Sequence, residues 1–425
     1  MRKADYLILG NGIAGLSAAG AVRGEDKDAR ILIVTREKWP TYVRPLLSKA
    51  GLKLADFDVL HMVDEAWHKE NRIELVRNMT AEEIDVKNHV IRCATDKIEY
   101  GKCIYALGGD AWLPPVKGRN FPGIFVLRNI EDMQAIKRWA LRAGRVVVIG
   151  GGVIGMEIGE ALYRHKMQVT VLENQPRILP RVLDEETAEE YVMRLNQVCK
   201  GTQGNLMVRT NVNVAEILGE DCVTGVRLAD GEVLDCDMVI FSCGIRSCTE
   251  LASRAGIEVE RAVVVDEYMR TSAEDIYACG DCAQFRGNCA ALWKPAMEQG
   301  RIAGLAACGV YEKYRPQKFP VLCNSSLVSL FAVGDLAIFG EEGYRIEVSD
   351  NRKDSGAAMS NGEEGCVAGR VRKEMEKIAV MPRETGTYKR LVYRGDRLVG
   401  AALVGNLSEM QALREKMADE EGSYE

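Results

Sequence analysis

Short apolar runs separated by glycine-rich turns dominate the first half of the chain. The apolar run YLIL at residues 6–9 leads into the turn GNGIAG, and a helical pattern follows up to residue 22. Residues 146–162, VVVIGGGVIGMEIGEAL, repeat this order of strand, turn and amphipathic helix. A second apolar strand follows each copy, at residues 29–35 and 168–173. The pattern predicts two β-α-β units of the dinucleotide-binding kind.

Both turns have the spacing G-x-G-x-x-G. The first glycine of such a turn permits a tight bend, the second leaves room for a pyrophosphate, and the third lets helix and strand approach closely. The helix then presents free N–H groups and the positive end of its dipole to the phosphates. A generic glycine-rich turn is the alternative for either copy alone, and the repeat weakens it. The predicted residues are Gly10, Gly12 and Gly15 in the first unit, and Gly150, Gly152 and Gly155 in the second.

A carboxylate is expected about 20 residues after each turn, where it accepts the ribose hydroxyls. Glu173 has this place in the second unit, and its charge would repel a 2′-phosphate, which favours NADH over NADPH. Arg177 lies near enough in sequence to oppose that preference. In the first unit Thr35 stands at the expected place, so Glu37 is the predicted ribose partner.

The connecting segments fit the same plan. Residues 77–109 alternate short apolar and polar runs, which predicts a small antiparallel meander returning to a buried strand. Residues 223–247 repeat this pattern with a turn at 230–231. Residues 292–304 read as a helix with Pro295 in its first turn, where a missing N–H costs nothing.

Composition and charge narrow the class of protein. A chain of 425 residues allows two or three domains. The net charge of -6 provides no basic field for nucleic acid. No apolar run is long enough to cross a membrane, and the run at residues 6–9 reads as a buried strand rather than a signal peptide. A cytoplasmic protein is therefore expected.

Thirteen cysteines and four histidines are scattered along the chain without metal-ligand spacing, so no metal site is expected. One Cys-x-x-Cys pair, Cys279 and Cys282, lies within TSAEDIYACGDCA at residues 271–283. Such a pair can be a redox disulfide, half of a metal site, or two small residues in a turn.

The two glycine units, TSAEDIYACGDCA, and YVRPLLSK at residues 42–49 together resemble the flavoprotein reductases that carry two dinucleotide-binding domains. Within them, the chain is similar to the NADH:rubredoxin reductase branch and to the flavoprotein part of assimilatory nitrite reductases. The resemblance implies an α/β fold with two Rossmann-like domains, an NAD domain inserted in an FAD domain, and a small α+β C-terminal domain. The implied boundaries are 1–113 and 238–316 for the FAD domain, 114–237 for the NAD domain, and 317–425 for the C-terminal domain.

The C-terminal domain has recognisable ends at residues 327–341 and 388–409. The polar stretch between them, residues 342–386, is longer than the resemblance leads one to expect. A mobile loop is the preferred interpretation, and a docking surface for a partner is the alternative.

In this family Gly280 approaches the pyrophosphate of FAD and Asp281 binds its ribityl chain. The disulfide cysteines of the wider superfamily lie elsewhere, one place being the stretch at residues 41–51, which has no cysteine here. The resemblance therefore implies that Cys279 and Cys282 are small residues in a turn.

The resemblance also implies a flavin site. Lys49 would pair with Glu157 beside the flavin N5, where a cation stabilises the reduced ring. The alternative is a solvated lysine and an ordinary helix glutamate. The N-terminus of the helix at 292–304 would face the N1/O2 edge of the flavin. Further implied cofactor contacts are Arg44, Ala81, Ala106, Gly108, Arg128, Gly244, Ala296 and Met297.

The implied activity is an FAD-dependent NADH oxidoreductase. A hydride passes from the nicotinamide to the flavin, and single electrons then pass to a small iron–sulfur carrier of the rubredoxin or ferredoxin type. One alternative is the flavoprotein subunit of a larger iron–sulfur complex, and the other is a redox sensor with low turnover. The assembly that we consider for such a protein is a homodimer, beside its electron-carrier partner.

Overall fold

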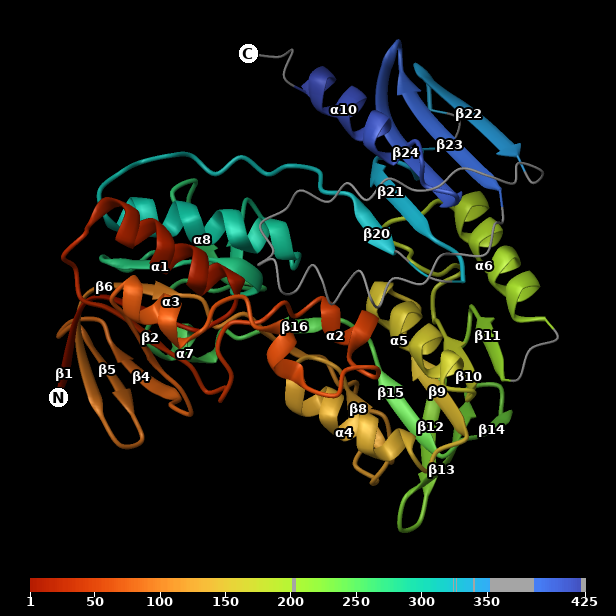
Figure 1. Cartoon of the computed structure of the whole chain (residues 1–425), viewed down its shortest axis with the longest axis horizontal. Coiled ribbons are helices and arrows are strands. Elements are labelled where there is room, and N and C mark those ends of the chain that lie inside the picture. Colours follow the sequence, from red (N-terminus) through yellow and green to blue (C-terminus); the bar gives the residue numbers. More distant parts are fainter. Residues whose placement is uncertain (201–203, 324, 326, 339–340, 352–385, 422–425) are drawn as a thin grey trace.

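The computed structural model describes residues 1–200, 204–323, 325, 327–338, 341–351 and 386–421. A mixed sheet, a parallel sheet and a C-terminal antiparallel sheet form three lobes, with the N-terminal lobe opposite the other two (Figure 1). Within the described residues, no helix combines the length and apolarity needed to cross a bilayer.

The first lobe contains a sheet whose central strands are buried apolar runs, as expected for a parallel sheet covered on both faces. The antiparallel meander expected within residues 77–109 is confirmed, because β4 pairs with β5 and β5 with β6. Along the sheet the strands are β3 (Ile73–Val76), β2 (Ile31–Val34), β1 (Arg2–Leu9), β6 (Lys97–Tyr105), β5 (Val90–Cys93) and β4 (Ala81–Asp85), with β18 (Ile276–Ala278) also paired to β6.

The second lobe is a five-stranded parallel sheet. The strand Met238–Phe241, which comes last in the sequence, lies inside this sheet and pairs with a strand on each side. A domain boundary after residue 237 would therefore cut through the sheet. We place that boundary after Phe241 and keep the other domain limits as proposals. In order the strands are β11 (Asn205–Arg209), β10 (Gln168–Leu172), β9 (Arg145–Ile149), β15 (Met238–Phe241) and β8 (Ile124–Val126).

A small antiparallel sheet extends this lobe. It contains β12 (Val214–Gly219), β13 (Val223–Leu228) and β14 (Val233–Asp235). The turn predicted at residues 230–231 joins the last two strands, and Gly231 has a φ of +94°, a conformation that favours glycine.

The chain passes twice between the lobes, and the two passages pair with each other. β7 (Gly109–Ala111) and β16 (Ile245–Ser247) form a two-stranded antiparallel sheet. The Trp112 N–H also donates to the Gly244 carbonyl at 2.9 Å. The second lobe is therefore an insertion whose two ends lie side by side.

Two helices cover the first sheet together, α1 (Ile13–Glu25) and α8 (Trp293–Ala307) (Figure 1). Gly300 and Gly304 lie one turn apart on α8, and a Cβ on either would overlap backbone carbonyls of α1. The two backbones can thus touch, which fixes the N-terminus of α8 relative to the first glycine turn.

The C-terminal lobe is an antiparallel sheet packed against α6 (Glu185–Cys199). Arg194 of α6 is 2% exposed and donates to the carbonyls of Gly386 and Val404, while buried Arg390 pairs with Asp184. The elements are β20 (Val321–Cys323), β21 (Leu330–Gly334), β24 (Arg397–Gly405), β23 (Thr387–Arg394), β22 (Tyr344–Asn351) and the helix α10 (Met410–Glu421).

The interpretation of residues 342–386 as a loop is wrong for its first part. Strand β22 pairs with β23 along its whole length and forms one edge of the C-terminal sheet. Tyr344, Ile346 and Val348 alternate with polar residues, which is the pattern of a strand, but this short alternation stands at the start of a long polar stretch. Residues 352–385 lie outside the described residues.

The remaining elements are short, or are helices that pack on the second sheet. They are α2 (Leu46–Ala50), α3 (Glu65–Glu70), α4 (Ile130–Ala140), α5 (Val153–Arg164), α7 (Glu250–Arg254), β17 (Val263–Val265), β19 (Ala283–Phe285) and the 3-10 helices η1 (Phe57–Leu60) and η2 (Gly280–Cys282).

The contact between α1 and α8 predicts opposite effects of two glycine substitutions. Gly300→Ala should lower the free energy of unfolding by about 1–3 kcal/mol, because the added methyl group meets the backbone of α1. Gly20→Ala is the control, since its Cβ would enter open space, and it should raise stability by about 0.5–1 kcal/mol. Denaturant unfolding measures both changes. Equal effects of the two substitutions would contradict the close contact.

Candidate functional site

A cavity of about 1800 Å³ runs between the two glycine turns and reaches the C-terminal lobe. A site for one drug-sized ligand is roughly 300–1,000 Å³, so this cavity has room for more than one such molecule. Most of the predicted site residues line it. These are Gly10, Gly12, Glu37, Arg44, Lys49, Ala81, Ala106, Gly108, Arg128, Gly150, Gly152, Glu157, Glu173, Gly244, Gly280, Asp281 and Ala296.

The two glycine turns have nearly the same backbone geometry. Gly10 and Gly150 have φ angles of +112° and +111°, in the region that favours glycine. Gly12 and Gly152 cap α1 and α5 in extended conformations, and a Cβ on either would enter open space. Open space before a helix N-terminus fits a pyrophosphate, so the residues present suit a dinucleotide in each turn.

Gly15 and Gly155 lie outside the cavity lining. A Cβ on either would overlap the carbonyl oxygen of the first glycine in its own turn. Their geometry matches the packing role predicted for the third glycine, and neither has direct access to a ligand.

Glu173 is buried, and its carboxylate stabilises the second glycine turn through hydrogen bonds. Its Oε2 accepts the Gly151 N–H at 2.7 Å and its Oε1 accepts the Gln175 N–H at 2.9 Å. Leu179 completes the contact by donating its N–H to the Gly151 carbonyl at 2.9 Å. Leu179 has a φ of +49°, which is rare for a leucine and is typical of strained positions at binding sites.

Arg177 does not compete with Glu173 in this arrangement. Its Nε donates to the Leu183 carbonyl at 2.9 Å and its Nη2 points to the Pro180 carbonyl at 3.4 Å. The guanidinium group therefore stabilises the loop that carries Leu179.

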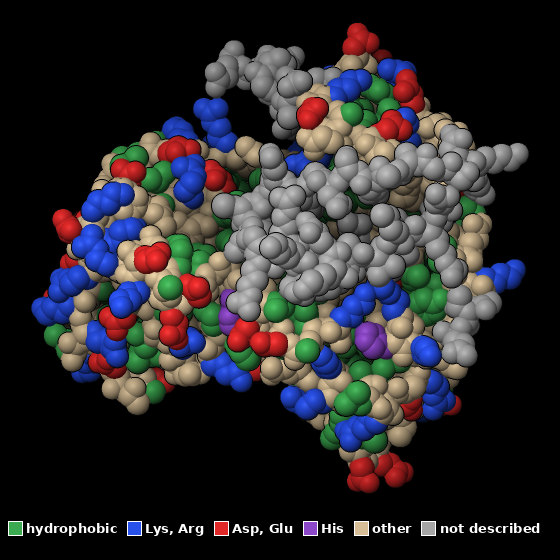
Figure 2. Space-filling view, viewed as in Figure 1, with side chains coloured by type: hydrophobic (Ala, Val, Ile, Leu, Met, Phe, Trp, Pro, Cys, Tyr) green, Lys and Arg blue, Asp and Glu red, His purple; other side chains and the backbone are tan. Residues whose placement is uncertain are grey.

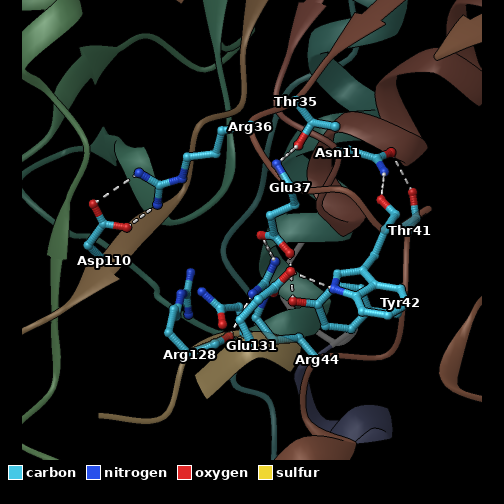
Figure 3. Close-up of polar contacts among 12 residues, drawn as sticks. Asn11, Thr35, Arg36, Glu37, Thr41, Tyr42, Arg44, Asp110, Arg128 and Glu131 are labelled. Carbon is cyan, nitrogen blue, oxygen red and sulfur yellow. Dashed lines mark hydrogen bonds and ion pairs between the residues drawn. The ribbon is translucent and has the colours of Figure 1, made fainter. Parts of the chain in front are cut away.

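Glu37 lies in a polar cluster at the end of β2 (Figure 3). Its carboxylate accepts from Arg44 Nη2 and from the Tyr42 hydroxyl, both at 2.8 Å. Burial raises the pKa of Tyr42, so the hydroxyl keeps its proton and donates it. Arg44 Nη1 also donates to the Arg128 carbonyl at 2.6 Å, which joins this cluster to the passage between the lobes.

Asp281 already has a cationic partner. Arg128 Nη2 lies 2.7 Å from Asp281 Oδ2, and the Ser247 hydroxyl donates to the Asp281 carbonyl at 2.7 Å. Gly280, with a φ of +79°, donates its N–H to Gln299 of α8 at 2.9 Å. The motif at residues 271–283 thus connects the first sheet, the passage between the lobes and α8.

The predicted pair of Lys49 and Glu157 is present across the contact of α2 and α5. The Lys49 Nζ lies 3.7 Å from Glu157 Oε1, and the Ser48 hydroxyl donates to Glu157 Oε2. Burial raises the pKa of Glu157, and Lys49 and Ser48 oppose the shift. The Lys49 side chain is 29% exposed and lines the cavity, which favours the pair over a lysine on the open surface.

Cys279 and Cys282 are free thiols with no exposed surface. Cys282 Sγ lies 3.4 Å from the Tyr105 carbonyl and 3.3 Å from the Cys279 carbonyl. Burial raises the pKa of Cys279 and raises that of Cys282 to about 12. Reactive thiols need access and a lowered pKa, so both features oppose a redox role.

The prediction for Met297 is not supported. Pro295 and Ala296 line the cavity at the start of α8, whereas Met297 lies outside the lining and is 37% exposed. Successive residues of a helix point about 100° apart, so neighbours on the first turn cannot all face one ligand.

Several residues of the site escaped the sequence analysis (Figure 3). Asn11 accepts from the Thr41 hydroxyl at 2.7 Å, and Arg36 pairs with Asp110. The Trp39 indole donates to Glu131 of α4 at 2.8 Å. Of these residues, only Asn11 could have been identified from the sequence, because it lies inside the first glycine turn.

Comparison with known proteins gives the family. The model for pyridine nucleotide-disulphide oxidoreductases matches residues 4–300. The model for the C-terminal domain of rubredoxin NAD+ reductase matches residues 365–421.

Two curated relatives cover 96% and 66% of the chain. A nitrite reductase (NAD(P)H) of Bacillus subtilis is 31% identical over 412 residues, which are 96% of this chain and 46% of that protein. A rubredoxin-NAD(+) reductase of Pseudomonas putida is 34% identical over 284 residues, 66% of this chain and 72% of that protein. The chain thus spans less than half the length of the nitrite reductase.

Solved structures agree with this assignment. A ferredoxin reductase of Rhodopseudomonas palustris has a TM-score of 0.78 and 26% identity, over 96% of this chain and 93% of that one. The branch that the motifs predicted is thus the one to which the relatives belong. The chain belongs to the pyridine nucleotide-disulphide oxidoreductase family.

Proposed function

We propose that the protein takes a hydride from NADH and passes single electrons to a small iron–sulfur carrier protein of the rubredoxin or ferredoxin type. The observation that carries the proposal is the single cavity that joins both glycine turns to the Lys49–Glu157 pair. FAD, when bound, accepts two electrons together and releases them one at a time. The names of the Pseudomonas and Rhodopseudomonas relatives support the type of carrier.

Different residues of the chain would bind the phosphates, bind the riboses and stabilise charge in the cavity. The N-termini of α1 and α5 bind phosphates through free N–H groups, next to Gly12 and Gly152. Glu37 and Glu173 are the proposed ribose partners. The Lys49 ammonium stabilises negative charge that develops in the cavity, and Glu157 holds Lys49 in place.

The preference for NADH over NADPH is part of this proposal. Glu173 lines the cavity and carries a charge that opposes a 2′-phosphate, while Arg177 is engaged with carbonyl groups.

A second candidate is an electron-transfer subunit or part of a larger enzyme. The match with the nitrite reductase favours it, because that match covers 96% of this chain and leaves more than half of the relative without a counterpart. Described acidic and basic side chains are mixed on the face in Figure 2, so their charge does not identify the partner. Co-purification of a cluster-bearing protein would distinguish this candidate.

We also propose a cytoplasmic location. The cysteines within the described residues are free thiols, which is typical of a reducing compartment. The homodimer remains a prediction.

An anaerobic titration with NADH tests the function. We expect the flavin absorbance to bleach completely at an equimolar amount of NADH, because Cys279 and Cys282 are buried thiols and FAD is then the sole redox centre. The variant Cys282→Ser should give the same endpoint. An endpoint at twice that amount, lost in the variant, would reveal a redox disulfide and contradict the proposal.

Removal of the Lys49 charge should slow the reduction of the flavin by NADH. Lys49→Met should lower the stopped-flow rate about tenfold or more, since an oriented cation in the site is lost, and Lys49→Arg should retain part of it. Lys87→Met, in an exposed turn, is the matched control. Equal rates in Lys49→Met and the control would exclude a role for this charge.

Glu173 should determine the choice between NADH and NADPH. Glu173→Gln should shift the ratio of the two kcat/KM values about tenfold toward NADPH, because the charge is lost while an amide oxygen can still accept the Gly151 N–H. Glu220→Gln, exposed in the same lobe, should leave the ratio unchanged. An unaltered ratio in Glu173→Gln would assign the preference to other residues.

A further inference from the structure

A row of polar side chains runs along one face of α5 from the site to the surface. Glu157, Glu160 and Arg164 are spaced three and four residues apart, which places them on neighbouring turns of the same face. All of them line the cavity, and so does exposed His165 at the helix end. The cavity wall therefore connects the Lys49–Glu157 pair with the C-terminal end of α5.

The two glutamates are buried, and the row reaches solvent only at the end of the helix. The Glu157 side chain is 11% exposed and Glu160 is 9% exposed, whereas Arg164 is half-buried and His165 is exposed. Glu157 Oε1 is buried and makes no hydrogen bond in the described structure, although Lys49 Nζ lies 3.7 Å away. One carboxylate oxygen next to the site is thus available to a proton.

Titratable groups from other elements face the same carboxylates. Tyr191 of α6 and Cys323 of β20 line the cavity, and burial raises the pKa of each, so both keep their protons. Lys53 after α2 faces Glu160 and Arg164, and burial lowers its pKa. The carboxylates are therefore the acceptors in this group, since Tyr191 and Cys323 remain neutral.

The proposed function leaves a proton to be removed. NADH gives up two electrons and one hydrogen nucleus as a hydride, whereas a one-electron carrier accepts electrons only. When two carriers have each taken one electron, one proton per NADH remains in the protein and must reach solvent. The following inference rests on that function.

We propose that Glu157 and Glu160 form the exit route for this proton. An O–H bond would form at Glu157 Oε1, on the side of Lys49, as an N–H bond of the reduced FAD breaks. The Glu157 O–H bond breaks in turn as an O–H bond forms on Glu160, which releases the proton to water at the exposed end of the row near His165. The raised pKa of Glu157 favours this uptake. Lys49 remains the cation of the site, and the electrons leave separately to the carrier.

The test measures proton release separately from electron transfer. The FAD-loaded protein is reduced with dithionite, freed of excess reductant, and mixed under anaerobic conditions with ferricyanide in weak buffer containing a pH indicator. In the wild-type protein, proton release should keep pace with the return of flavin absorbance. In Glu160→Gln, proton release should lag at least about tenfold, and Glu160→Asp should restore most of the rate.

Glu189→Gln is the matched control, because Glu189 is exposed on α6 and the chemical change is the same. It should behave as the wild-type protein. Flavin content and the oxidised spectrum report whether each variant keeps an intact site. Proton release that stays with the flavin signal in intact Glu160→Gln would overturn the route.

A measurement on the wild-type protein covers the case in which Glu160→Gln does not fold. Time-resolved infrared spectra recorded during the reoxidation should contain the transient band of a protonated, buried carboxyl group. Absence of any such band would overturn the proposal. The dithionite step makes both tests independent of NADH, so failure of NADH to reduce the flavin would affect the proposed function alone.

Discussion

Direct contact between backbones, with no side chain in between, determines where both dinucleotide sites lie. In each glycine turn the third glycine touches the carbonyl of the first, and this contact fixes the helix N-terminus over the end of its strand. The first glycine in turn lies against the next strand, at Ala106 in one unit and Ser242 in the other. A methyl group at any of these places would move the N–H groups that are to bind phosphate.

The same constraint extends to α8. Gly300 and Gly304 bring this helix onto α1, so the segment that begins at Trp293 reaches the cavity of the first unit. Glycines far apart in sequence thus determine the positions of α1 and α8 relative to the first sheet, and these elements surround the charged residues of the site.

The sequence predicted those parts of the site that depend on local pattern. The glycine turns, Glu173, and the motifs around Lys49 and Asp281 are recognisable because a few residues at fixed spacing carry the whole requirement. The conformation of Leu179 and the partners of Arg177 could not be predicted, since both depend on a loop folding back onto Gly151. Strand β22 was missed because its short apolar alternation, Tyr344, Ile346 and Val348, stands at the start of a long polar stretch. The expected boundary after residue 237 left β15 outside the second lobe, because the pairing of β15 is not local.

Ion pairs hold the lobes together around the cavity. Arg128–Asp281 and Lys49–Glu157 each join residues from different lobes, and Arg194 and Arg390 attach the C-terminal sheet to α6. Pairs with so little exposed surface add little net stability, because their desolvation offsets their attraction. Arg128–Asp281 and Lys49–Glu157 bring side chains of different lobes together on the lining of the cavity.

The pairing of β7 with β16 indicates that the second lobe could be inserted into the first as a unit. Since the insertion leaves and re-enters the first lobe at adjacent points, a short linker could close the gap if the second lobe were removed. Domains whose ends lie side by side can be gained, lost or exchanged as units. The repeated β-α-β pattern is therefore compatible with an ancestral gene duplication in which one copy was placed inside a loop of the other.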